Sequence, residues 1–367
     1  MCAATMRLGP NAPYHRLLGV GGMGAGLYFA LEGNHTLGRN ESRAALLLDS
    51  RDYFKLHIIL HYVSVVLGAN PTGVPFHVLP IGRLGDDQQG RRLREEMAGV
   101  GMDLACVETV PGQPTMLGVC FQYPDGSGGN ITPVNSAANG LIADDLNRYE
   151  PLIAGGARCM VLAAPEVSLE VRAHLLSLGT RHGALRVASF ISAELPPARA
   201  AGMLRRIDLL ALNQDEAAAL CGLPFESVPL ERFLNACAHA VRTEQPAMRL
   251  VISAGPSGVY ALDGSVWTHV PAAAVDVVST AGAGDALLGG LLAGLAAGLP
   301  FAPASGRPAL GSAVELGVLL AGVSVTSPHT IHPGADLNAV LTLAAELDRA
   351  VPPALIPIFY AGSTPWL

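Results

Sequence analysis

Short apolar runs rich in β-branched residues alternate along the chain with longer segments rich in Ala and Leu. The short runs predict strands and the longer segments predict helices. The predicted strands are Phe76–Pro80, Met160–Ala163, Leu209–Leu212, Leu250–Ser253 and Gly258–Leu262. The predicted helices are Asp87–Val100, Ser168–Arg181, Gln214–Cys221, Leu230–Arg242 and Ala283–Gly298. Strands separated by such helices predict βαβ units, and therefore an α/β fold whose mostly parallel central sheet is covered by helices on both faces.

Two segments interrupt this alternation. Residues 28–50 and 105–135 have strand-like patterns without intervening helices, and the second contains the turn signals Pro111-Gly112 and Pro124-Asp125-Gly126. Such strands fit poorly inside a parallel sheet, so we expect them to form a small β lid beside it. Because α/β folds of this length are often one unit, we interpret residues 1–367 as a single three-layer domain that carries this lid.

The hydrophobic content raises the question of a membrane span, because 50% of the residues are hydrophobic and only 14% are charged. The longest apolar stretch, Ala286–Leu299, contains four glycines and is shorter than the about 20 residues that a membrane helix needs. We therefore expect a buried core helix there and no membrane partner. The first residues lack a long apolar run, and the six cysteines show no metal-binding spacing, so a cytoplasmic protein with reduced thiols is expected.

The net charge of the chain argues against a further class of partner. The net charge is −7 and no basic run is present to neutralise phosphates, so a nucleic-acid partner is not expected. Among 23 basic residues only Lys55 is a lysine. A coding bias toward arginine explains this pattern, but a site that needs a compact ammonium group would resist exchange to arginine. Both explanations remain open: Lys55 has a functional role, or it is the one lysine that the coding bias has left.

The strongest chemical signal is the loop Ser279–Asp285, which lies between the β-like run Ala274–Val278 and a strongly helical run. Backbone N–H groups at the start of a helix bind anions, and glycines let the backbone approach a phosphate closely. A carboxylate beside such an anion site can accept the proton of an attacking hydroxyl. The alternative interpretation is an ordinary glycine-rich turn followed by an Asp that favours the first turn of a helix.

This loop resembles the C-terminal signature of the ribokinase, or PfkB, family of carbohydrate and nucleoside kinases. The family signature reads D-T-T-G-A-G-D, and its last four positions are identical to Gly282-Ala283-Gly284-Asp285. The resemblance implies ATP and Mg²⁺ as cofactors, Asp285 as catalytic base, the N–H groups of Gly282, Ala283 and Gly284 as the anion site, and Thr280 as a nucleotide contact.

The signature also has departures. Ser279 replaces the first Asp, Ala281 replaces Thr or Asn, and Leu287 replaces Phe. Because that first Asp often orders a monovalent cation in relatives, Ser279 puts activation by potassium in doubt.

Two further motifs resemble the nucleotide half of the family. Asn213-Gln214-Asp215-Glu216 is similar to its N-x-x-E element, which implies that Asn213 and Glu216 organise Mg²⁺ and phosphate, acting through water. The same spacing is also typical of a helix capping box. Ser253, Gly255 and Gly258 occupy the positions of a T-x-G-x-x-G turn that borders the ATP phosphates, although a plain β-turn also fits.

The order of the motifs strengthens the resemblance. Gly85-Asp86-Asp87, Gly101, the Asn213 element, the Ser253 turn and the Gly282 loop follow one another in family order between about residues 76 and 335. By position in the family alone, the segment Ala321–His332 is expected to wall the adenine pocket.

The acceptor half departs from the family. Most sugar kinases of this type carry an Asp shortly after the first strand and a G-G-x-x-x-N helix start, and both are missing here. In their place we expect Arg51, Asp52, Lys55 and His57, with Asn130 from the lid, to bind the acceptor. Arg51, Lys55 and His57 suit an acceptor with negative charge, and Asp52 suits a hydroxyl. The alternatives are an ordinary helix, or a metal site formed by His57 and His61, which lie on the same face of a helix.

Three functions remain open from the sequence. The preferred one is an ATP-dependent kinase for a hydroxyl on a sugar, polyol, sugar acid or nucleoside, with a homodimer through the open lid strands as a further expectation. The second is a non-catalytic ligand-binding or regulatory relative. The third is a nicotinamide-dependent oxidoreductase, since Gly19, Gly21 and Gly24 fit G-x-G-x-x-G, a fingerprint that also needs a following helix.

Overall fold

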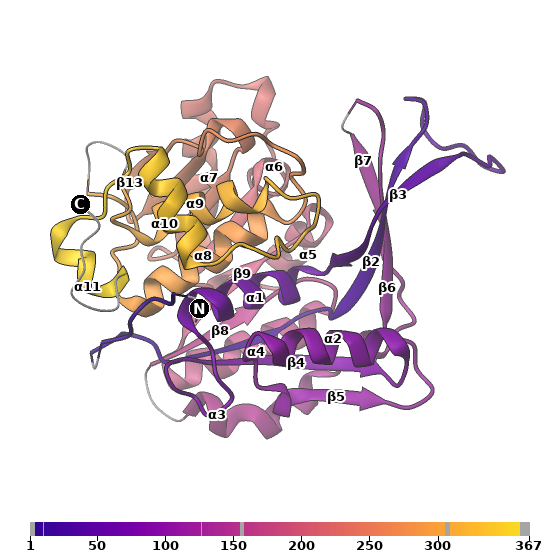
Figure 1. Cartoon of the computed structure of the whole chain (residues 1–367), viewed down its shortest axis with the longest axis horizontal. Coiled ribbons are helices and arrows are strands. Elements are labelled where there is room, and N and C mark those ends of the chain that lie inside the picture. The colour runs from indigo at the N-terminus through magenta and orange to yellow at the C-terminus, as the bar shows by residue number, and fades with distance from the viewer. Residues whose placement is uncertain (1–3, 10, 126, 155–157, 305–308, 360–367) are drawn as a thin grey trace.

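A nine-stranded sheet forms the centre of the computed structural model, which describes residues 4–9, 11–125, 127–154, 158–304 and 309–359 (Figure 1). Seven neighbouring strands are parallel, and the last two at one edge are antiparallel. In spatial order they are β13 (Val266–Val270), β12 (Val259–Asp263), β11 (Arg249–Ser253), β10 (Leu209–Asn213), β9 (Leu185–Ser189), β8 (Cys159–Ala163), β1 (Arg16–Val20), β4 (His77–Gly85) and β5 (Val107–Val110).

Helices cover both faces of this sheet because alternate strand residues point to opposite sides. Leu17, Val78 and Met160 belong to one buried cluster, and their neighbours Leu18 and Leu79 belong to the other. The helices are α1 (Lys55–Leu67), α2 (Gln88–Gly99), α3 (Glu150–Ala154), α4 (Leu169–His182), α5 (Leu195–Ala200), α6 (Gln214–Cys221), α7 (Leu230–Glu244), α8 (Ala283–Ala297), α9 (Ala313–Ser324), α10 (Leu337–Glu346) and α11 (Ile356–Phe359). The first cluster includes residues of α1, α2, α8, α9 and α10, and the second includes residues of α4, α6 and α7.

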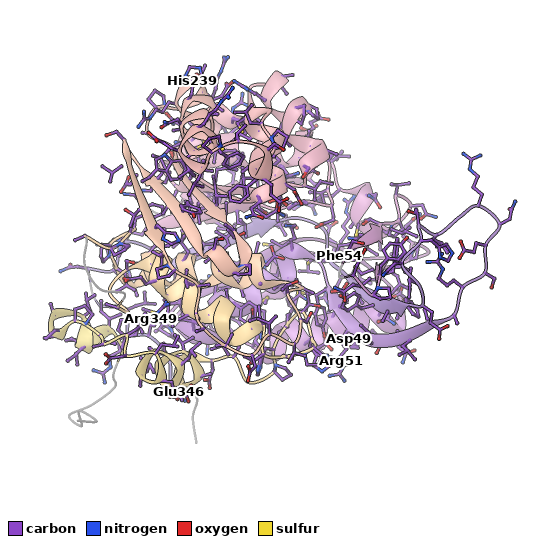
Figure 2. The ribbon with its side chains drawn as sticks, turned by 90° about the horizontal axis from the view of Figure 1, so that it is seen from above. Asp49, Arg51, Phe54, His239, Glu346 and Arg349 are labelled. Atoms are coloured by element: carbon purple, nitrogen blue, oxygen red, sulfur yellow. The ribbon has the colours of Figure 1, made fainter. Side chains whose placement is uncertain are left out.

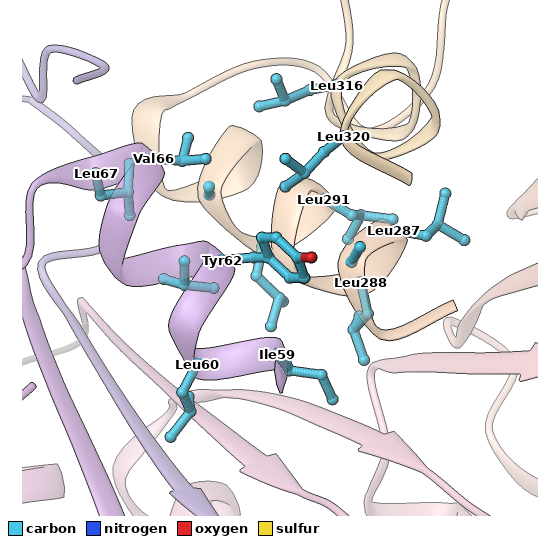
Figure 3. Close-up of a cluster of buried hydrophobic side chains, with 14 of the residues drawn as sticks. Ile59, Leu60, Tyr62, Val66, Leu67, Leu287, Leu288, Leu291, Leu316 and Leu320 are labelled. Carbon is cyan, nitrogen blue, oxygen red and sulfur yellow. The ribbon is translucent and has the colours of Figure 1, made fainter. Parts of the chain in front are cut away.

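Helix α8 packs closely against both α1 and α9, as Figure 3 shows for their leucines and for Tyr62. Glycines allow this approach: a Cβ at Gly289 would lie 2.7 Å from the Cβ of Tyr62, and one at Gly290 would lie 2.9 Å from the Cα of Gly317. Every residue of α8 from Ala286 onward is buried. This packing holds the first turn of α8 next to the first turn of α1, which positions the site.

A second, four-stranded sheet stands apart from the main body (Figure 1). Its strands in spatial order are β3 (Ala45–Tyr53), β2 (Gly24–Leu31), β6 (Met116–Gln122) and β7 (Gly128–Ile131). The two segments expected to form a lid, 28–50 and 105–135, supply most of this sheet. One part of that prediction is wrong, because Val107–Val110 pairs with β4 at the edge of the main sheet.

The predicted fold class is confirmed: the chain has a three-layer α/β architecture with a large, mostly parallel sheet and a second, smaller sheet. The five predicted helices and five predicted strands are all present, with ends that differ by a few residues. The β-like run Ala274–Val278 is an exception, because it forms no strand and follows the edge strand β13 as an irregular segment. Within the described ranges, no helix has the length and apolar character needed to cross a membrane.

Candidate active site

The glycine loop begins α8 as the sequence predicts. Gly282 is the residue before the first turn and has φ 77°, a left-handed conformation that favours glycine. A Cβ at Gly282 would lie 2.6 Å from the carbonyl oxygen of Thr330, so close packing also requires glycine here. The N–H group of Ala283 donates to the Thr280 carbonyl at 3.2 Å, which leaves it less available to a phosphate than its neighbours. The start of this 15-residue helix therefore has N–H groups, other than that of Ala283, that are suited to bind an anion.

Asp285 lies in the first turn of α8 and faces a cation. The Nζ atom of Lys55 is 3.8 Å from Asp285 Oδ1 and 3.4 Å from Glu216 Oε1. The side chains of Lys55 and Asp285 are 27% and 13% exposed, so both groups are partly shielded from water. Although burial of the ammonium favours its neutral form, the carboxylates of Asp285, Glu216 and Glu166 raise the pKa of Lys55. The single lysine of the chain is thus a charged group beside the candidate base.

The pKa of Asp285 is raised to about 6, in the first place by burial of its carboxyl group. The positive charge of Lys55 acts in the opposite direction, and the carboxylates of Glu216 and Asp52 raise the pKa further. A carboxyl group with this pKa is ionised at neutral pH and still holds a proton more readily than an ordinary Asp. Such a group is suited to accept a proton from a hydroxyl.

Asn213 and Glu216 form the capping box that was one of the two interpretations of their spacing. Asn213 Oδ1 accepts from the Glu216 N–H group at 2.8 Å, and Glu216 Oε2 accepts from the Asn213 N–H group at 2.8 Å. The other oxygen of Glu216 is directed to Lys55. The capping role therefore leaves one carboxylate oxygen beside Lys55 and Asp285.

The residues of this site fit Mg²⁺ that is bound together with substrate phosphates and water, and not Mg²⁺ held by protein side chains alone. In the part of the chain that the structure describes, no group of three or more His, Cys, Asp or Glu side chains is arranged to hold a metal ion. Mg²⁺ commonly binds through one or two carboxylates together with substrate phosphates and water. The Glu216 oxygen that faces Lys55 and the nearby Asp285 carboxylate fit that kind of binding, with ATP supplying the remaining oxygens.

The Ser253 turn lies next to the glycine loop. A Cβ added to Gly284 would be 3.9 Å from Ser253 Oγ, which shows how near the serine hydroxyl is to the start of α8. Gly258 has φ 87°, and a Cβ there would lie 2.3 Å from the Val270 carbonyl oxygen. Gly255 has φ 52° and has open space around its Cα. The tertiary structure therefore brings together two motifs that are separated in the sequence.

A cavity of about 360 Å³ lies between the second sheet and the start of α8. Of the predicted site residues, it is lined by Asp52, Lys55, Asn130, Thr280, Gly282 and Asp285. Aromatic rings of Tyr28, Phe54 and Phe121 form part of its wall. In this cavity the candidate base meets residues of the second sheet.

Two predicted acceptor residues lie outside the cavity, which corrects the expectation for them. His57 is 2% exposed, its ring lies 4.7 Å from that of Tyr53, and burial lowers its pKa to about 3. Arg51 is exposed on β3 and does not line the cavity. In Figure 2 its side chain lies toward the rim of the molecule, whereas Phe54 lies further inward. Helix periodicity turns His57 into the core, and strand alternation turns Arg51 away from its neighbour Asp52.

Asp52 faces the cavity, but its carboxylate already has partners. It accepts from Thr330 Oγ1 at 2.5 Å, from the Cys120 thiol at 2.9 Å and from the Tyr53 N–H group at 3.0 Å. Nearby, His329 Nδ1 lies 2.8 Å from Asp49 Oδ2. Both carboxylates belong to β3, so they connect the second sheet to the segment after α9.

Glu166 is a site residue that the sequence reasoning missed. It follows β8, has φ 68° and lines the cavity, and its Oε2 atom is buried with no hydrogen-bond partner among the described residues. Burial, reinforced by the Asp285 carboxylate and opposed by Lys55, raises its pKa to about 8. The only signal in the sequence was an acidic residue shortly after a predicted parallel strand, where such sheets bind ligands.

The N-terminal glycines do not form a dinucleotide fingerprint, because no helix follows them. Gly24 begins β2, and the chain continues into the second sheet. A Cβ at Gly21 would lie 2.9 Å from the Ala164 Cβ and 3.0 Å from the Leu56 Cβ. Close packing of β1 against its neighbours accounts for this glycine, so the oxidoreductase hypothesis loses its structural basis.

Comparison with known proteins identifies the family of the chain. The model of the pfkB family carbohydrate kinases matches residues 67–336. The chain belongs to this family. The predicted family is thus confirmed, and with it a kinase as the class of enzyme. The match covers the Asn213, Ser253 and Gly282 motifs. It begins after β2, β3 and Lys55, so of the predicted acceptor residues only Asn130 lies within it.

Curated relatives of this pfkB family member are sugar kinases. A deoxyribokinase of Salmonella typhi is 26% identical over 219 residues, which cover 58% of this chain and 66% of that protein. A fructokinase of Klebsiella pneumoniae is 38% identical over 114 residues, which cover 30% of this chain and 34% of that protein. The matched regions therefore span less than two thirds of these relatives.

Solved structures with the same fold match nearly the whole chain. Arabidopsis thaliana ribokinase complexed with ribose and ATP has a TM-score of 0.65 and 20% identity, covering 89% of this chain and 98% of that one. A putative ribokinase II of E. coli in complex with ATP and Mg²⁺ has a TM-score of 0.67 and 15% identity, covering 90% and 99%. At these identities the likeness establishes the fold.

Proposed function

We propose that the protein transfers the γ-phosphoryl group of ATP to a hydroxyl of a sugar, polyol, sugar acid or nucleoside, with Asp285 as the general base. One observation carries this proposal: Asp285 follows the glycine loop directly, lines the cavity and has a pKa raised to about 6. The acceptor binds in the cavity between the second sheet and α8. The Asp285 carboxylate accepts the proton of its attacking hydroxyl.

The start of α8 stabilises the charge of the transferred phosphoryl group. The N–H groups around Gly282 and Gly284 are directed outward at the positive end of the helix dipole. Lys55 adds a positive charge next to them and keeps Asp285 ionised. Glu166 and Asn130 bind other hydroxyls of the acceptor, because an unpartnered carboxylate oxygen and a side-chain amide are suited to hydroxyl groups.

ATP binds over the Ser253 turn. Ser253, Gly255 and Gly258 border its phosphates, and Thr280 contacts them from the glycine loop. Asn213 holds Glu216 in place through the capping box. Glu216 and Asp285 would hold Mg²⁺, partly through water, and the ion would neutralise phosphate charge. The nearness of Ser253 to Gly284 supports this arrangement.

The second sheet acts as a lid and as a dimer surface. As a lid it excludes water from the cavity and so limits ATP hydrolysis. Its outer residues include exposed apolar side chains, with Leu46 67% and Ile131 61% exposed, and its edge strands β3 and β7 are unpaired on one side within the described structure. Exposed apolar residues and open strand edges support a homodimer that pairs these sheets.

The deciding experiment measures ADP formation from Mg-ATP with a panel of sugars, polyols, sugar acids, inositols and nucleosides. The wild type and Asp285→Asn are compared, and ATP binding to both is measured by calorimetry. We expect one class of acceptor to stimulate ADP release and Asp285→Asn to reduce kcat about 100-fold or more while ATP still binds. Equal turnover in the two proteins would overturn the assignment of the base, and absence of ATP binding would overturn the proposal as a whole.

A further inference from the structure

Two cysteines meet where α6 packs against α7. Cys221 is the last residue of α6, and Cys237 lies on α7. Their sulfur atoms lie near consecutive carbonyl groups of one helical turn: Cys237 Sγ is 3.8 Å from the Ala217 oxygen, and Cys221 Sγ is 3.9 Å from the Ala218 oxygen. The two thiols are also hydrogen-bonded to each other. The fold thus brings together two thiols that their spacing in the sequence does not connect.

The two thiols differ in their access to small molecules. Cys237 is completely buried, whereas Cys221 is half-buried and lines a second cavity of about 420 Å³ between α5 and α6, which also has Leu195 and Arg199 in its wall. Burial, followed by the interaction with Cys221, raises the pKa of the Cys237 thiol. Because the thiolate is the reactive form of cysteine, Cys237 is protected from direct oxidation. A small oxidant that enters the second cavity therefore meets Cys221 first.

Three other cysteines of the described ranges lack these features. Cys106 and Cys159 are buried, and the Cys120 thiol donates to Asp52. Burial raises the pKa of each of these three thiols to about 12, so little reactive thiolate forms at neutral pH. Among these residues, the combination of an accessible thiol and a neighbouring thiol is found at Cys221.

We propose that a hydroperoxide oxidises Cys221 and Cys237 to a disulfide, and that this modification weakens the binding of Mg-ATP. In the first step the Cys221 sulfur attacks the peroxide, the O–O bond breaks, and a sulfenic acid forms with release of water or an alcohol. In the second step the Cys237 sulfur attacks the Cys221 sulfur, the S–O bond breaks, and the thiol proton leaves with the hydroxide as water. The two electrons lost by the thiols reduce the peroxide.

Helix α6 connects this pair to the nucleotide half of the active site. Its first turn contains the capping box of Asn213 and Glu216, and Glu216 Oε1 lies 3.4 Å from Lys55 Nζ. A covalent bond brings the two sulfur atoms closer together than a hydrogen bond does, so oxidation draws the last turn of α6 toward α7. Because α6 has only 8 residues, about 12 Å, its two ends belong to one short rigid element. The effect on Mg-ATP rests on the proposed function, in which Glu216 would hold Mg²⁺.

The first test detects the disulfide without reference to activity. The reduced protein is treated with hydrogen peroxide, its remaining thiols are blocked, and its peptides are analysed by mass spectrometry. We expect a cross-linked peptide pair that contains Cys221 and Cys237 and that dithiothreitol separates. In Cys237→Ala the sulfenic acid should persist at Cys221 and be captured by dimedone. Cys106→Ala, which changes a buried cysteine outside the pair, should still form the disulfide.

Oxidation that produces no disulfide between Cys221 and Cys237 would overturn the proposal. Dimedone labelling of Cys237→Ala at other cysteines but not at Cys221 would overturn it as well, because Cys221 would then not be the thiol that reacts first.

The second test measures the affinity for Mg-ATP by calorimetry before and after oxidation. We expect the Kd to rise by about fivefold or more, to recover with dithiothreitol, and to stay unchanged by peroxide in Cys221→Ser and in Cys237→Ala. A disulfide that leaves the Kd unchanged, or a rise that persists in both variants, would overturn the link to the nucleotide site. Failure of the proposed function gives a different result, because the reduced protein would then not bind Mg-ATP although the disulfide still forms.

Discussion

The pKa of the Asp285 carboxyl group is raised by some of its surroundings and lowered by others, and the balance decides at which pH the group can act as a base. Burial and the neighbouring carboxylates of Glu216 and Asp52 favour its protonated form, whereas Lys55 favours the ionised form. Without the lysine, Asp285 would hold its proton near neutral pH and accept none from the substrate. The ammonium group therefore sets the range of pH over which the base is available.

This balance predicts the pH dependence of catalysis. Since Asp285 must be ionised to accept a proton, kcat/KM should fall tenfold per pH unit below about 6, where its pKa lies. Lys55→Met removes the group that lowers this pKa, so the acidic limb should move to higher pH by about 1 to 2 units. Lys55→Arg, which keeps the charge, and Arg51→Met, which changes a cation outside the cavity, serve as controls. An unchanged limb in Lys55→Met would contradict this role.

The raised pKa of Glu166 should also make the stability of the folded protein depend on pH. Its pKa in the folded protein is raised from 4.5 to about 8, so the folded state binds its proton more tightly than the unfolded state. The resulting stabilisation is complete below about pH 4.5 and is lost as the pH rises through 8.

Glu166→Gln removes the stabilisation that comes from the protonated carboxyl group. The free energy of unfolding should therefore fall less between pH 6 and pH 9 in the variant than in the wild type. The expected difference is on the order of 2 kcal/mol, measured by urea denaturation at both pH values. The matched control is Glu170→Gln, an exposed carboxylate on α4. Parallel pH dependence in wild type and Glu166→Gln would show that the carboxyl group is not protonated in the folded protein.

At the scale of elements, β3 connects the second sheet to the segment that follows α9. Asp49 pairs with His329, and Asp52 accepts from Thr330 Oγ1. Thr330 also packs on Gly282, because a Cβ there would be 2.6 Å from the Thr330 carbonyl oxygen. Thr330 therefore contacts both β3 and the glycine loop.

Removing one of these contacts should loosen the second sheet. Thr330→Val deletes the donor to Asp52 while keeping the shape of the side chain, so the acceptor KM should increase by about three- to tenfold. ADP release without acceptor should also increase, because water enters the cavity more easily. Both are measured in steady-state assays, with Thr326→Val as the control, since Thr326 bonds only to the Val323 carbonyl in the described structure. If the two variants behave alike, the contact does not hold the second sheet.

At the scale of the whole molecule, the second sheet is the part that is least covered. The main sheet is buried on both faces by helices, whereas the second sheet exposes Leu46, Ile131 and neighbouring apolar side chains. The second sheet therefore has an apolar surface that a second copy of the chain can cover.

This surface predicts the oligomeric state. We expect the wild type to be a dimer in multi-angle light scattering, and Ile131→Asp to shift it toward the monomer by placing a charge in the buried interface. The control is Val266→Asp, which changes a residue of similar exposure, 63%, at the other end of the molecule on β13. A wild-type monomer at micromolar concentration, or dissociation by both substitutions, would contradict pairing through the second sheet.

The sequence predicted the elements and the nucleotide half because those signals are local. The alternation of strands and helices follows from short-range periodicity, and the loop Gly282–Asp285 keeps glycine and carboxylate in consecutive positions. The capping box of Asn213 and Glu216 is likewise contained in four residues. Such patterns specify backbone conformation without knowledge of the rest of the chain.

Only the tertiary structure decided which polar residues share the cavity. Arg51 is next to Asp52 in the sequence, and His57 is two residues after Lys55. A strand and a helix turn such near neighbours in different directions, so Asp52 and Lys55 line the cavity whereas the other two residues do not. Glu166 is distant in sequence from Asp285 and joins it because β8 lies beside β1 in the main sheet. Strand order and side-chain direction arise from burial of the whole core, and no local motif contains them.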